Sequence, residues 1–181
     1  MHELKSKRLH LRKLNAEDAS ERYASWLNDP VVNRFLEVRH VQHSILTCQS
    51  FIATTNADES SHLLGIFTNE GSKHIGNIKL GPIDARYSSG QVSLFIGEKE
   101  FWGAGYATEA LHRIAQFAFD DLKLFRLEAG CYEDNLGSLR VFLKSGFTVE
   151  GFFRKKFTID GKRTGCFWLG ALRDEWKDNR I

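Results

Sequence analysis

The chain has 181 residues, of which 42% are hydrophobic and 27% charged, and its formal net charge at pH 7 is +2. This composition is typical of an ordinary folded protein, and we expect one domain over residues 1–181. The small charge and the lack of a long apolar run argue against a nucleic-acid partner and against a membrane partner. The basic residues near the N-terminus, Arg8 and Arg12 among them, are typical of a solvated strand face.

The three cysteines, Cys48, Cys131 and Cys166, are far apart in the sequence and odd in number. They show no Cys-x-x-Cys or Cys/His spacing, so we expect neither a disulfide framework nor a metal site. The opening residues Met-His-Glu-Leu-Lys lack the pattern of a signal peptide. Together these features favour a cytoplasmic protein.

The first predicted element is a half-buried strand over residues 8–14, where polar and apolar residues alternate. Asn15 can cap a helix over 16–27 because its side-chain oxygen can accept a backbone hydrogen bond. Pro30 suits the first turn of a short helix over 31–36. The N-terminal part is therefore predicted as one strand followed by helices.

The rest of the chain alternates strand-like and helix-like patterns separated by turn residues. The predicted elements are a helix over 43–56, antiparallel strands over 62–68, 73–80 and 91–96, a loop over 97–102, a helix over 106–122, a strand over 126–132, a helix over 136–144, and two strands over 149–159 and 163–171. This order indicates a mixed α/β domain in which two central strands each precede a helix.

The segment 101–110 reads Phe-Trp-Gly-Ala-Gly-Tyr-Ala-Thr-Glu-Ala and lies between a predicted strand and a predicted helix. Gly103 and Gly105 permit unusual backbone angles and the close approach of a ligand. The first turn of a helix offers unpaired N–H groups, so this turn can cradle a phosphate. A glycine-rich turn is also a plain structural device, and this segment alone leaves both interpretations open.

A second motif follows the next strand. Residues 135–140 read Asn-Leu-Gly-Ser-Leu-Arg, and the helix that they begin ends at 144–147, Lys-Ser-Gly-Phe. Together the two motifs resemble the GNAT superfamily, whose first motif is (Gln/Arg)-x-x-Gly-x-(Gly/Ala) and whose second is Asn-x-x-(Ala/Ser) ending in Gly-Phe. The details are similar to the branch that includes the ribosomal-protein N-terminal acetyltransferases. The resemblance covers nearly the whole chain.

The resemblance implies an acetyl-CoA-dependent N-acetyltransferase with a central, mostly antiparallel sheet flanked by helices. Its two central strands would splay apart and hold the pantetheine arm, while backbone amides of 102–107 would hold the pyrophosphate. A main-chain amide within 94–96 would stabilise the carbonyl oxygen. The residues thus assigned to the cofactor are Leu94, Phe95, Ile96, Trp102, Gly103, Ala104, Gly105, Tyr106, Ala107, Asn135, Ser138, Arg140 and Lys144.

The chain departs from the family pattern at two positions. Glu100 stands where Gln or Arg is usual, and we expect it to turn to solvent. Phe142 stands where many members place a tyrosine proposed as general acid, which leaves Ser138 to protonate the departing thiolate. The resemblance also implies that Asn135 binds the pantetheine arm. Direct transfer needs a base for the amine, and the candidates are Glu133, Glu128 and Glu37, each of which can equally be a surface carboxylate.

The acceptor pocket of such folds lies in the helical segment near the N-terminus. The residues that the resemblance assigns to it are Trp26, Phe35, Glu37, Arg39 and His40, although these also suit plain helix packing. The acceptor would be a small-molecule amine, with an amino sugar as one option, or a protein N-terminus. Dimers are common in this family, so a homodimer is a further expectation.

Two other functions fit parts of the sequence. The glycines at 103 and 105, followed by Glu128, have a spacing close to that of a dinucleotide-binding oxidoreductase. Thr108 in place of a third small residue, and the antiparallel strands before the motif, argue against it. A non-catalytic acyl-CoA-binding sensor is the other alternative, because of Phe142.

Overall fold

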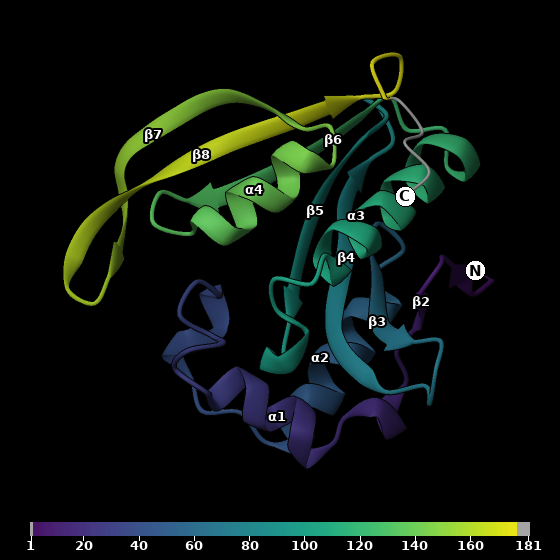
Figure 1. Ribbon diagram of the computed structural model, residues 1–181, viewed down its shortest axis with the longest axis vertical. Helices are drawn as coiled ribbons and strands as arrows, with labels where there is room; N and C mark the ends of the chain where they lie inside the picture. Colours follow the sequence, from purple (N-terminus) through teal and green to yellow (C-terminus); the bar gives the residue numbers. More distant parts are fainter. Residues whose placement is uncertain (1, 177–181) are drawn as a thin grey trace.

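The computed structural model describes residues 2–176, which form one eight-stranded sheet with helices on both of its faces (Figure 1). The strand order is β1-β2-β3-β4-β5-β6-β8-β7, and all neighbouring pairs are antiparallel except β5 with β6. The strands are β1 (Leu4–Lys5), β2 (Leu9–Lys13), β3 (His62–Thr68), β4 (His74–Asp84), β5 (Ser89–Ile96), β6 (Arg126–Tyr132), β7 (Thr148–Ile159) and β8 (Lys162–Leu172). The predicted mixed α/β class and mostly antiparallel sheet are confirmed.

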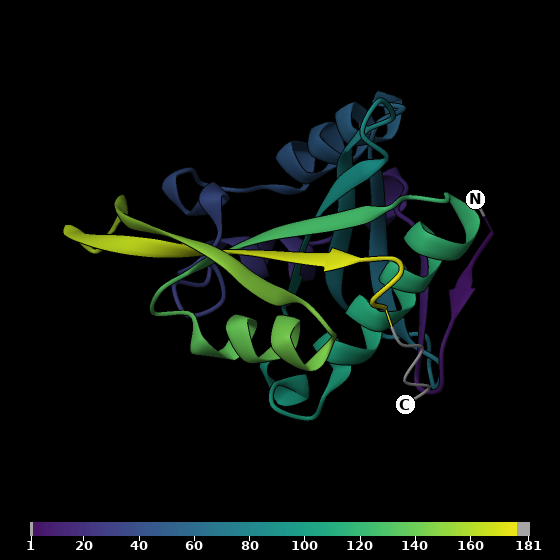
Figure 2. The same ribbon diagram turned by 90° about the horizontal axis from the view of Figure 1, so that it is seen from above.

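The helices lie on the two faces of this sheet, with α2 on one face and α3 and α4 on the other (Figure 2). They are α1 (Glu21–Asn28), α2 (Ile45–Ala57), α3 (Tyr106–Gln116), which continues as a π-helical turn (Phe117–Asp121), and α4 (Leu136–Lys144). Short 3-10 turns cover Ala16–Asp18, Glu37–His40 and Lys99–Phe101. The buried apolar residues of α3, Ala110 and Leu111 followed by Ile114 and Ala115, recur after three to four positions, which explains why this amphipathic segment packs as a helix against the sheet.

Two helices predicted near the N-terminus differ from the structure. The single helix predicted over 16–27 is a 3-10 turn capped by Asn15, followed by a separate helix α1. The break occurs at Ser20, which has an extended backbone and whose hydroxyl accepts a hydrogen bond from the Tyr23 N–H. A second helix-capping side chain inside the segment therefore starts a new helix.

The short helix predicted over 31–36 is also wrong, because this segment forms turns. Asp29 Oδ1 accepts the Val31 N–H, and the Asn33 amide donates to the carbonyl of Leu27 at 2.6 Å. These side chains offer the backbone an alternative to helical hydrogen bonds. The helical turn comes later, over Glu37–His40.

The core has one part on each face of the sheet. The larger part packs α3 and α4 against the sheet, with Leu111, Ile114 and Leu127 fully buried. The smaller part packs α1 and α2 on the other face, around Tyr23 and Ile52. Rigid packing on both faces fixes where β5 and β6 lie, and these strands position the site described below.

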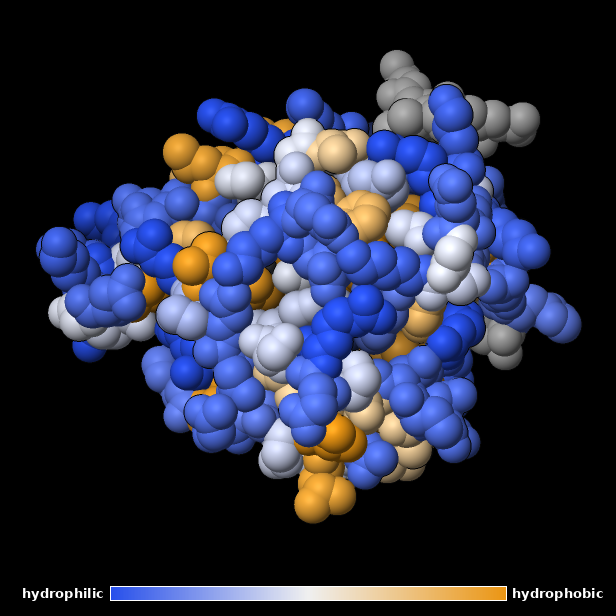
Figure 3. Space-filling view, turned by 60° about the horizontal axis from the view of Figure 1, so that its bottom comes forward, coloured by the Kyte–Doolittle hydropathy of each residue, from blue (hydrophilic) through white to orange (hydrophobic). Residues whose placement is uncertain are grey.

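The surface is mostly polar. On the face shown in Figure 3, apolar residues form several small patches separated by polar ones. Within residues 2–176, no helix has both the length and the apolar character needed to cross a bilayer.

Candidate active site

The two central strands of the sheet separate from one another. β5 and β6 pair only through Ser89–Gln91 with Arg126–Glu128, and neither strand pairs with the other beyond these residues. In Figure 1 they move apart toward their arrowheads. The backbones of 92–96 of β5 and 129–132 of β6 therefore diverge, and we call this V-shaped divergence of the two strands the wedge. The predicted splay is confirmed.

The loop 102–105 leads from the end of β5 to the start of α3. Gly103 and Gly105 have φ angles of +73° and +83°, in the left-handed region that favours glycine. Nothing lies within 4 Å of a Cβ placed on Gly103, so this side of the loop is open. Gly105 is the N-cap of α3 and provides no side chain to bind the first N–H groups of the helix. These groups are therefore available to an anion, which fits the predicted pyrophosphate site.

The same loop is fixed to the N-terminal part of the chain by Arg8. Its Nη1 donates to the carbonyl of Ala104 at 3.0 Å, and its guanidinium carbon lies 4.1 Å from the centroid of the Tyr106 ring. Glu109 in turn binds the Arg8 Nε at 2.6 Å and also accepts from the Arg8 N–H and the Ser6 hydroxyl. Arg8, expected on a solvated strand face, is partly exposed, and Glu109 on α3 holds its guanidinium.

Burial alone would raise the pKa of Glu109, but hydrogen bonds from Arg8 and Ser6 lower it below the ordinary value. The carboxylate is therefore charged at neutral pH and keeps the Arg8 guanidinium in place. Sequence reasoning missed this pair. The Glu in the motif Tyr-Ala-Thr-Glu-Ala was the available signal, since a carboxylate in the first turn of a helix is expected to face a donor.

Glu100, the first departure from the family pattern, is exposed and forms an ion pair with Lys73. The predicted orientation toward solvent is confirmed, and Lys73 partly neutralises the carboxylate near the loop. Lys73 also approaches Glu98 at 3.5 Å.

On the other side of the wedge, α4 begins directly after β6. The side chain of Asn135 caps the helix, because its Oδ1 accepts the Ser138 N–H at 3.1 Å. Ser138 lies one helical turn along and contacts the thiol of Cys131. Burial raises the pKa of Cys131 to about 11, although the hydrogen bond with Ser138 opposes this shift. Asn135 thus has a structural role in addition to any contact with a cofactor.

The remaining predicted positions of α4 differ in burial. Phe142, the second departure, is 2% exposed and packs on Phe147 with ring centroids 5.1 Å apart. It is part of the core and carries no polar group toward the wedge. Arg140 and Lys144 are exposed, and their contact with a cofactor phosphate stays a prediction.

Tyr132, the last residue of β6, contacts three residues of the segment 30–40 at the open end of the wedge. Its hydroxyl donates a hydrogen bond to Glu37 Oε1 and accepts one from Arg39 Nη1 at 3.2 Å. Phe35 packs on its ring at a centroid distance of 6.1 Å. Arg39 also donates to the carbonyl of Thr158, so the segment bridges to the hairpin β7–β8. Sequence reasoning predicted Phe35, Glu37 and Arg39 but missed Tyr132, whose phenol immediately before the second motif was the signal.

Trp26 is not part of this group. It is 5% exposed, packs against His74 and Phe95, and donates its indole N–H to Glu98 at 3.1 Å. Helix α1 thus turns Trp26 into the core, and it is not among the residues that line the cleft described below, so its assignment to the acceptor pocket stays a prediction.

The three candidate bases have different partners. Glu128 pairs with Arg126 at 2.7 Å where β5 and β6 are still joined. Glu133 is exposed, and its Oε2 accepts the Gly165 N–H at 2.7 Å. Only Glu37 binds a hydroxyl group at the end of the wedge.

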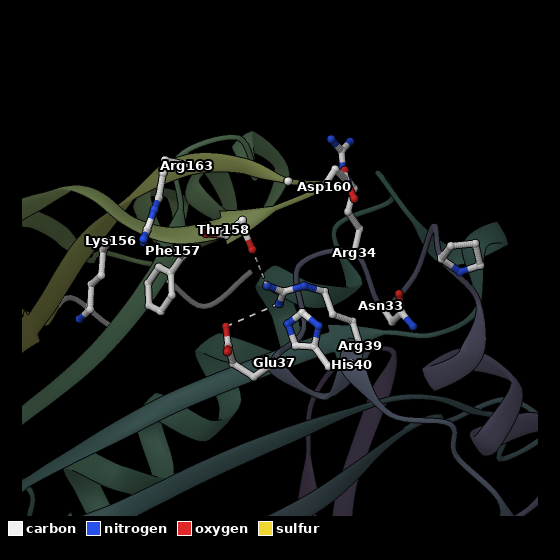
Figure 4. Close-up of a pocket in the computed structure, with 12 residues that line it drawn as sticks. Asn33, Arg34, Glu37, Arg39, His40, Lys156, Phe157, Thr158, Asp160 and Arg163 are labelled. Carbon is white, nitrogen blue, oxygen red and sulfur yellow. Dashed lines mark hydrogen bonds and ion pairs between the residues drawn. The ribbon is translucent and has the colours of Figure 1, made fainter.

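A cleft of about 680 Å³ opens beside Glu37, between the segment 30–40 and the hairpin β7–β8 (Figure 4). We call it the acceptor cleft because three of the residues assigned to the acceptor from the sequence, Glu37, Arg39 and His40, line it; that assignment stays a prediction. Its lining residues are Pro30, Asn33, Arg34, Glu37, Arg39, His40, Lys156, Phe157, Thr158, Asp160, Gly161 and Arg163. His40, predicted with this group, is therefore among them.

Comparison with known proteins defines the class of this fold and site. Residues 8–148 match the family described as acetyltransferase (GNAT) domain. The chain is 34% identical over 167 residues to "Probable N-acetyltransferase YjcK" of Bacillus subtilis (strain 168), which covers 87% of this chain and 90% of that protein. The chain therefore belongs to the GNAT family of N-acetyltransferases.

Solved structures agree in fold. A structure described as "Probable acetyltransferase" has a TM-score of 0.86 and 25% identity and covers 97% of this chain and 99% of its own. The spermidine N-acetyltransferase of Vibrio cholerae, in complex with CoA and spermine, has a TM-score of 0.83 and 19% identity over 93% of this chain and 97% of its own. The family assignment overturns the oxidoreductase alternative. The sheet also argues against a parallel dinucleotide-binding fold, because among the described strands only β5 and β6 pair in parallel.

Proposed function

We propose that this protein transfers the acetyl group of acetyl-CoA directly to a primary amine held in the acceptor cleft. The single observation that carries the proposal is the wedge between β5 and β6, which has an open anion cradle at 102–107 on one side and the Tyr132–Glu37 pair at its mouth. A cofactor with a pyrophosphate and a long, narrow arm fits this arrangement. Acetyl-CoA, when bound, supplies the acetyl group as a thioester.

In this proposal the chain holds the cofactor mainly through its backbone. Amides from Trp102 to Ala107 bind the pyrophosphate, and the segment 94–96 of β5, which does not pair with β6, offers an N–H to the carbonyl oxygen, where negative charge develops. Asn135 fixes the start of α4 beside the arm, and Arg140 and Lys144 add positive charge from the same helix.

Proton transfer is assigned to groups at the mouth of the wedge. An alkyl amine has a pKa of about 10 and is mostly protonated at neutral pH, so a base must take a proton before attack. Glu37 is our first candidate, because its carboxylate reaches the end of the wedge through Tyr132. Glu133 is the second, although its Oε2 is bound to the Gly165 N–H. Ser138 is the proposed proton donor to the leaving thiol.

Direct transfer is favoured over an acyl-enzyme on Cys131. Burial raises the pKa of this thiol to about 11, and a thiol rather than a thiolate is a poor nucleophile. Cys48 and Cys166 are also buried, and burial raises the pKa of both.

The acceptor is an amine of a small molecule, an amino sugar among the options, or a protein N-terminus. The volume of the cleft lies within the range of small-molecule sites, which favours the first. All three cysteines are free thiols, which supports a reducing cytoplasm as the place of action. A homodimer stays an expectation of the family.

Isothermal titration of the protein with acetyl-CoA tests the proposal. We expect micromolar binding that Gly105→Glu abolishes, because the new side chain is strained at positive φ and repels the phosphates. Gly161→Ala is a matched control, since Gly161 has a φ of +74° in the β7–β8 turn, away from the loop. Absence of acetyl-CoA binding, or equal loss in both variants, would overturn the proposal.

A further inference from the structure

The acceptor cleft carries an excess of positive charge. Four of its lining side chains are permanent cations, whereas two are carboxylates. The cations are Arg34, Arg39, Lys156 and Arg163, and the carboxylates are Glu37 and Asp160. A cleft of this sign attracts anions and repels polycations.

Each of the two carboxylates in the cleft forms an ion pair with one of two arginines. Arg34 Nε lies 3.5 Å from Asp160 Oδ2, and Arg39 Nη1 lies 3.7 Å from Glu37 Oε1. Arg39 is also committed to the carbonyls of Leu36 and Thr158. These two cations therefore hold the segment 30–40 in place and are not the ones left to bind a ligand.

The other two cations are available. Within residues 2–176, no carboxylate lies within 4.0 Å of Lys156 Nζ or of the Arg163 guanidinium. Arg163 is exposed. The ammonium of Lys156 lies 4.3 Å from the Phe153 ring centroid and 5.3 Å from that of Phe157, contacts that orient it without removing its charge. Figure 4 shows both side chains projecting from the hairpin β7–β8.

We propose that the acceptor is an amine that also carries an anionic group, phosphate or carboxylate, which Arg163 and Lys156 bind. The inference rests on the proposed function, since it names the acceptor of that same site. The amine end would lie at Glu37 and the anionic end at the hairpin, so each end of the substrate meets the opposite charge. A polyamine would leave Arg163 and Lys156 facing like charge.

The chemistry of the two cations suits such a group. A guanidinium binds phosphate or carboxylate through two parallel N–H bonds, and an ammonium adds a point charge. A charge-assisted contact of this kind corresponds to about a tenfold change in affinity. The cleft of about 680 Å³ accommodates a molecule of the size of a phosphorylated sugar.

The test uses the full chain saturated with CoA, so that the cofactor loop cannot bind the added anion. Two pairs of amines are titrated, glucosamine 6-phosphate against glucosamine and β-alanine against β-alaninamide, with spermidine as a polycation and a short peptide with a free N-terminus as a protein-type acceptor. Each pair differs only in the anionic group. We expect the anionic member of at least one pair to bind the CoA-saturated protein about tenfold more tightly, and the pair identifies the anion. In a separate assay with acetyl-CoA as the acetyl donor, the same amine should be acetylated with a higher kcat/KM.

Two variants then locate the effect. Arg163→Ala should reduce the preference for the anionic member of the pair about tenfold. Lys162→Ala removes a cation from the adjacent exposed residue, which lies outside the cleft, and should change this preference less than about twofold. Equal affinity within both pairs, tighter binding of spermidine, equal loss in the two variants, or a peptide N-terminus as the better substrate would each overturn the inference. In all these cases acetyl-CoA still binds, whereas failure to bind acetyl-CoA would overturn the proposed function itself.

Discussion

The guanidinium of Arg8 lies 2.6 Å from the carboxylate of Glu109, 101 residues away in the sequence, and also binds the carbonyl of Ala104. The pair therefore connects the residue directly before strand β2 with helix α3 and with the glycine loop that precedes α3. In the proposed function this loop binds the cofactor through its backbone, so its conformation would decide how well its N–H groups meet an anion. Arg8 and Glu109 are positioning residues in this arrangement.

Glu109→Gln should weaken acetyl-CoA binding about tenfold, because the Arg8 guanidinium loses its charged partner and no longer holds the Ala104 carbonyl of the loop in place. The free energy of unfolding should also fall by about 1–3 kcal/mol. Isothermal titration and urea unfolding measure the two effects. Asp18→Asn is the matched control, since it breaks the Arg12–Asp18 pair of 2.6 Å at the end of the same strand without touching the loop. A comparable loss of cofactor affinity in this control would contradict the positioning role.

The contribution of Glu109 should depend on pH in a defined direction. Hydrogen bonds from Arg8 and Ser6 outweigh burial and keep its pKa below the ordinary value of 4.5. A lowered pKa stabilises the folded state above the unfolded pKa, and that stability is lost as the pH falls through the folded pKa. The difference in unfolding free energy between wild type and Glu109→Gln should therefore be constant near neutral pH and shrink below about 4.5. A difference that grows on acidification would refute this assignment.

Glu37→Gln should lower kcat about 100-fold or more if Glu37 takes the proton of the amine. Raising the pH should partly restore the rate, because more of the amine is then neutral. Tyr132→Phe should lower kcat less, since it removes only the hydroxyl that orients Glu37. Glu133→Gln, measured in parallel, separates the two candidates. If only the Glu133 variant loses activity, the base is Glu133.

Cys131→Ala should keep most of the activity, and initial-rate plots should show a ternary complex rather than a ping-pong mechanism. At pH 7 about one Cys131 thiol in 10,000 is ionised with a pKa of about 11, too few for efficient attack on a thioester. Labelling with a thiol reagent, which needs the thiolate, should be slow at neutral pH. An acetylated enzyme observed by mass spectrometry would overturn direct transfer.

Substitutions at Asn135 and Ser138 should separate an effect on stability from an effect on catalysis. Asn135→Ala removes the N-cap of α4 and should cost about 1 kcal/mol of stability, whereas Asn135→Asp keeps the acceptor oxygen and should cost little. Ser138→Ala should leave stability nearly unchanged and lower kcat by up to about tenfold, because a thiol is already a good leaving group. Urea unfolding and steady-state kinetics on the same variants decide between these effects.

The sequence by itself determined the elements whose signals are local. The predicted bounds of β3, β6 and α4 agree with the structure, and the two glycines do adopt left-handed φ angles. Alternation, capping residues and glycine turns act over a few residues, and these interactions are the same whatever the rest of the chain does. The glycine-rich turn before α3 could therefore be predicted without a structure, whereas its binding of an anion stays a prediction.

Only the tertiary structure decided which distant residues meet. It brought Glu37 and Arg39 to Tyr132, more than 90 residues away, turned Trp26 into the core, and bound Arg8 to Glu109. It also divided the predicted helix 16–27 at Ser20. Such contacts depend on how the two faces of the sheet pack and on where β5 and β6 separate, and no short stretch of sequence encodes either.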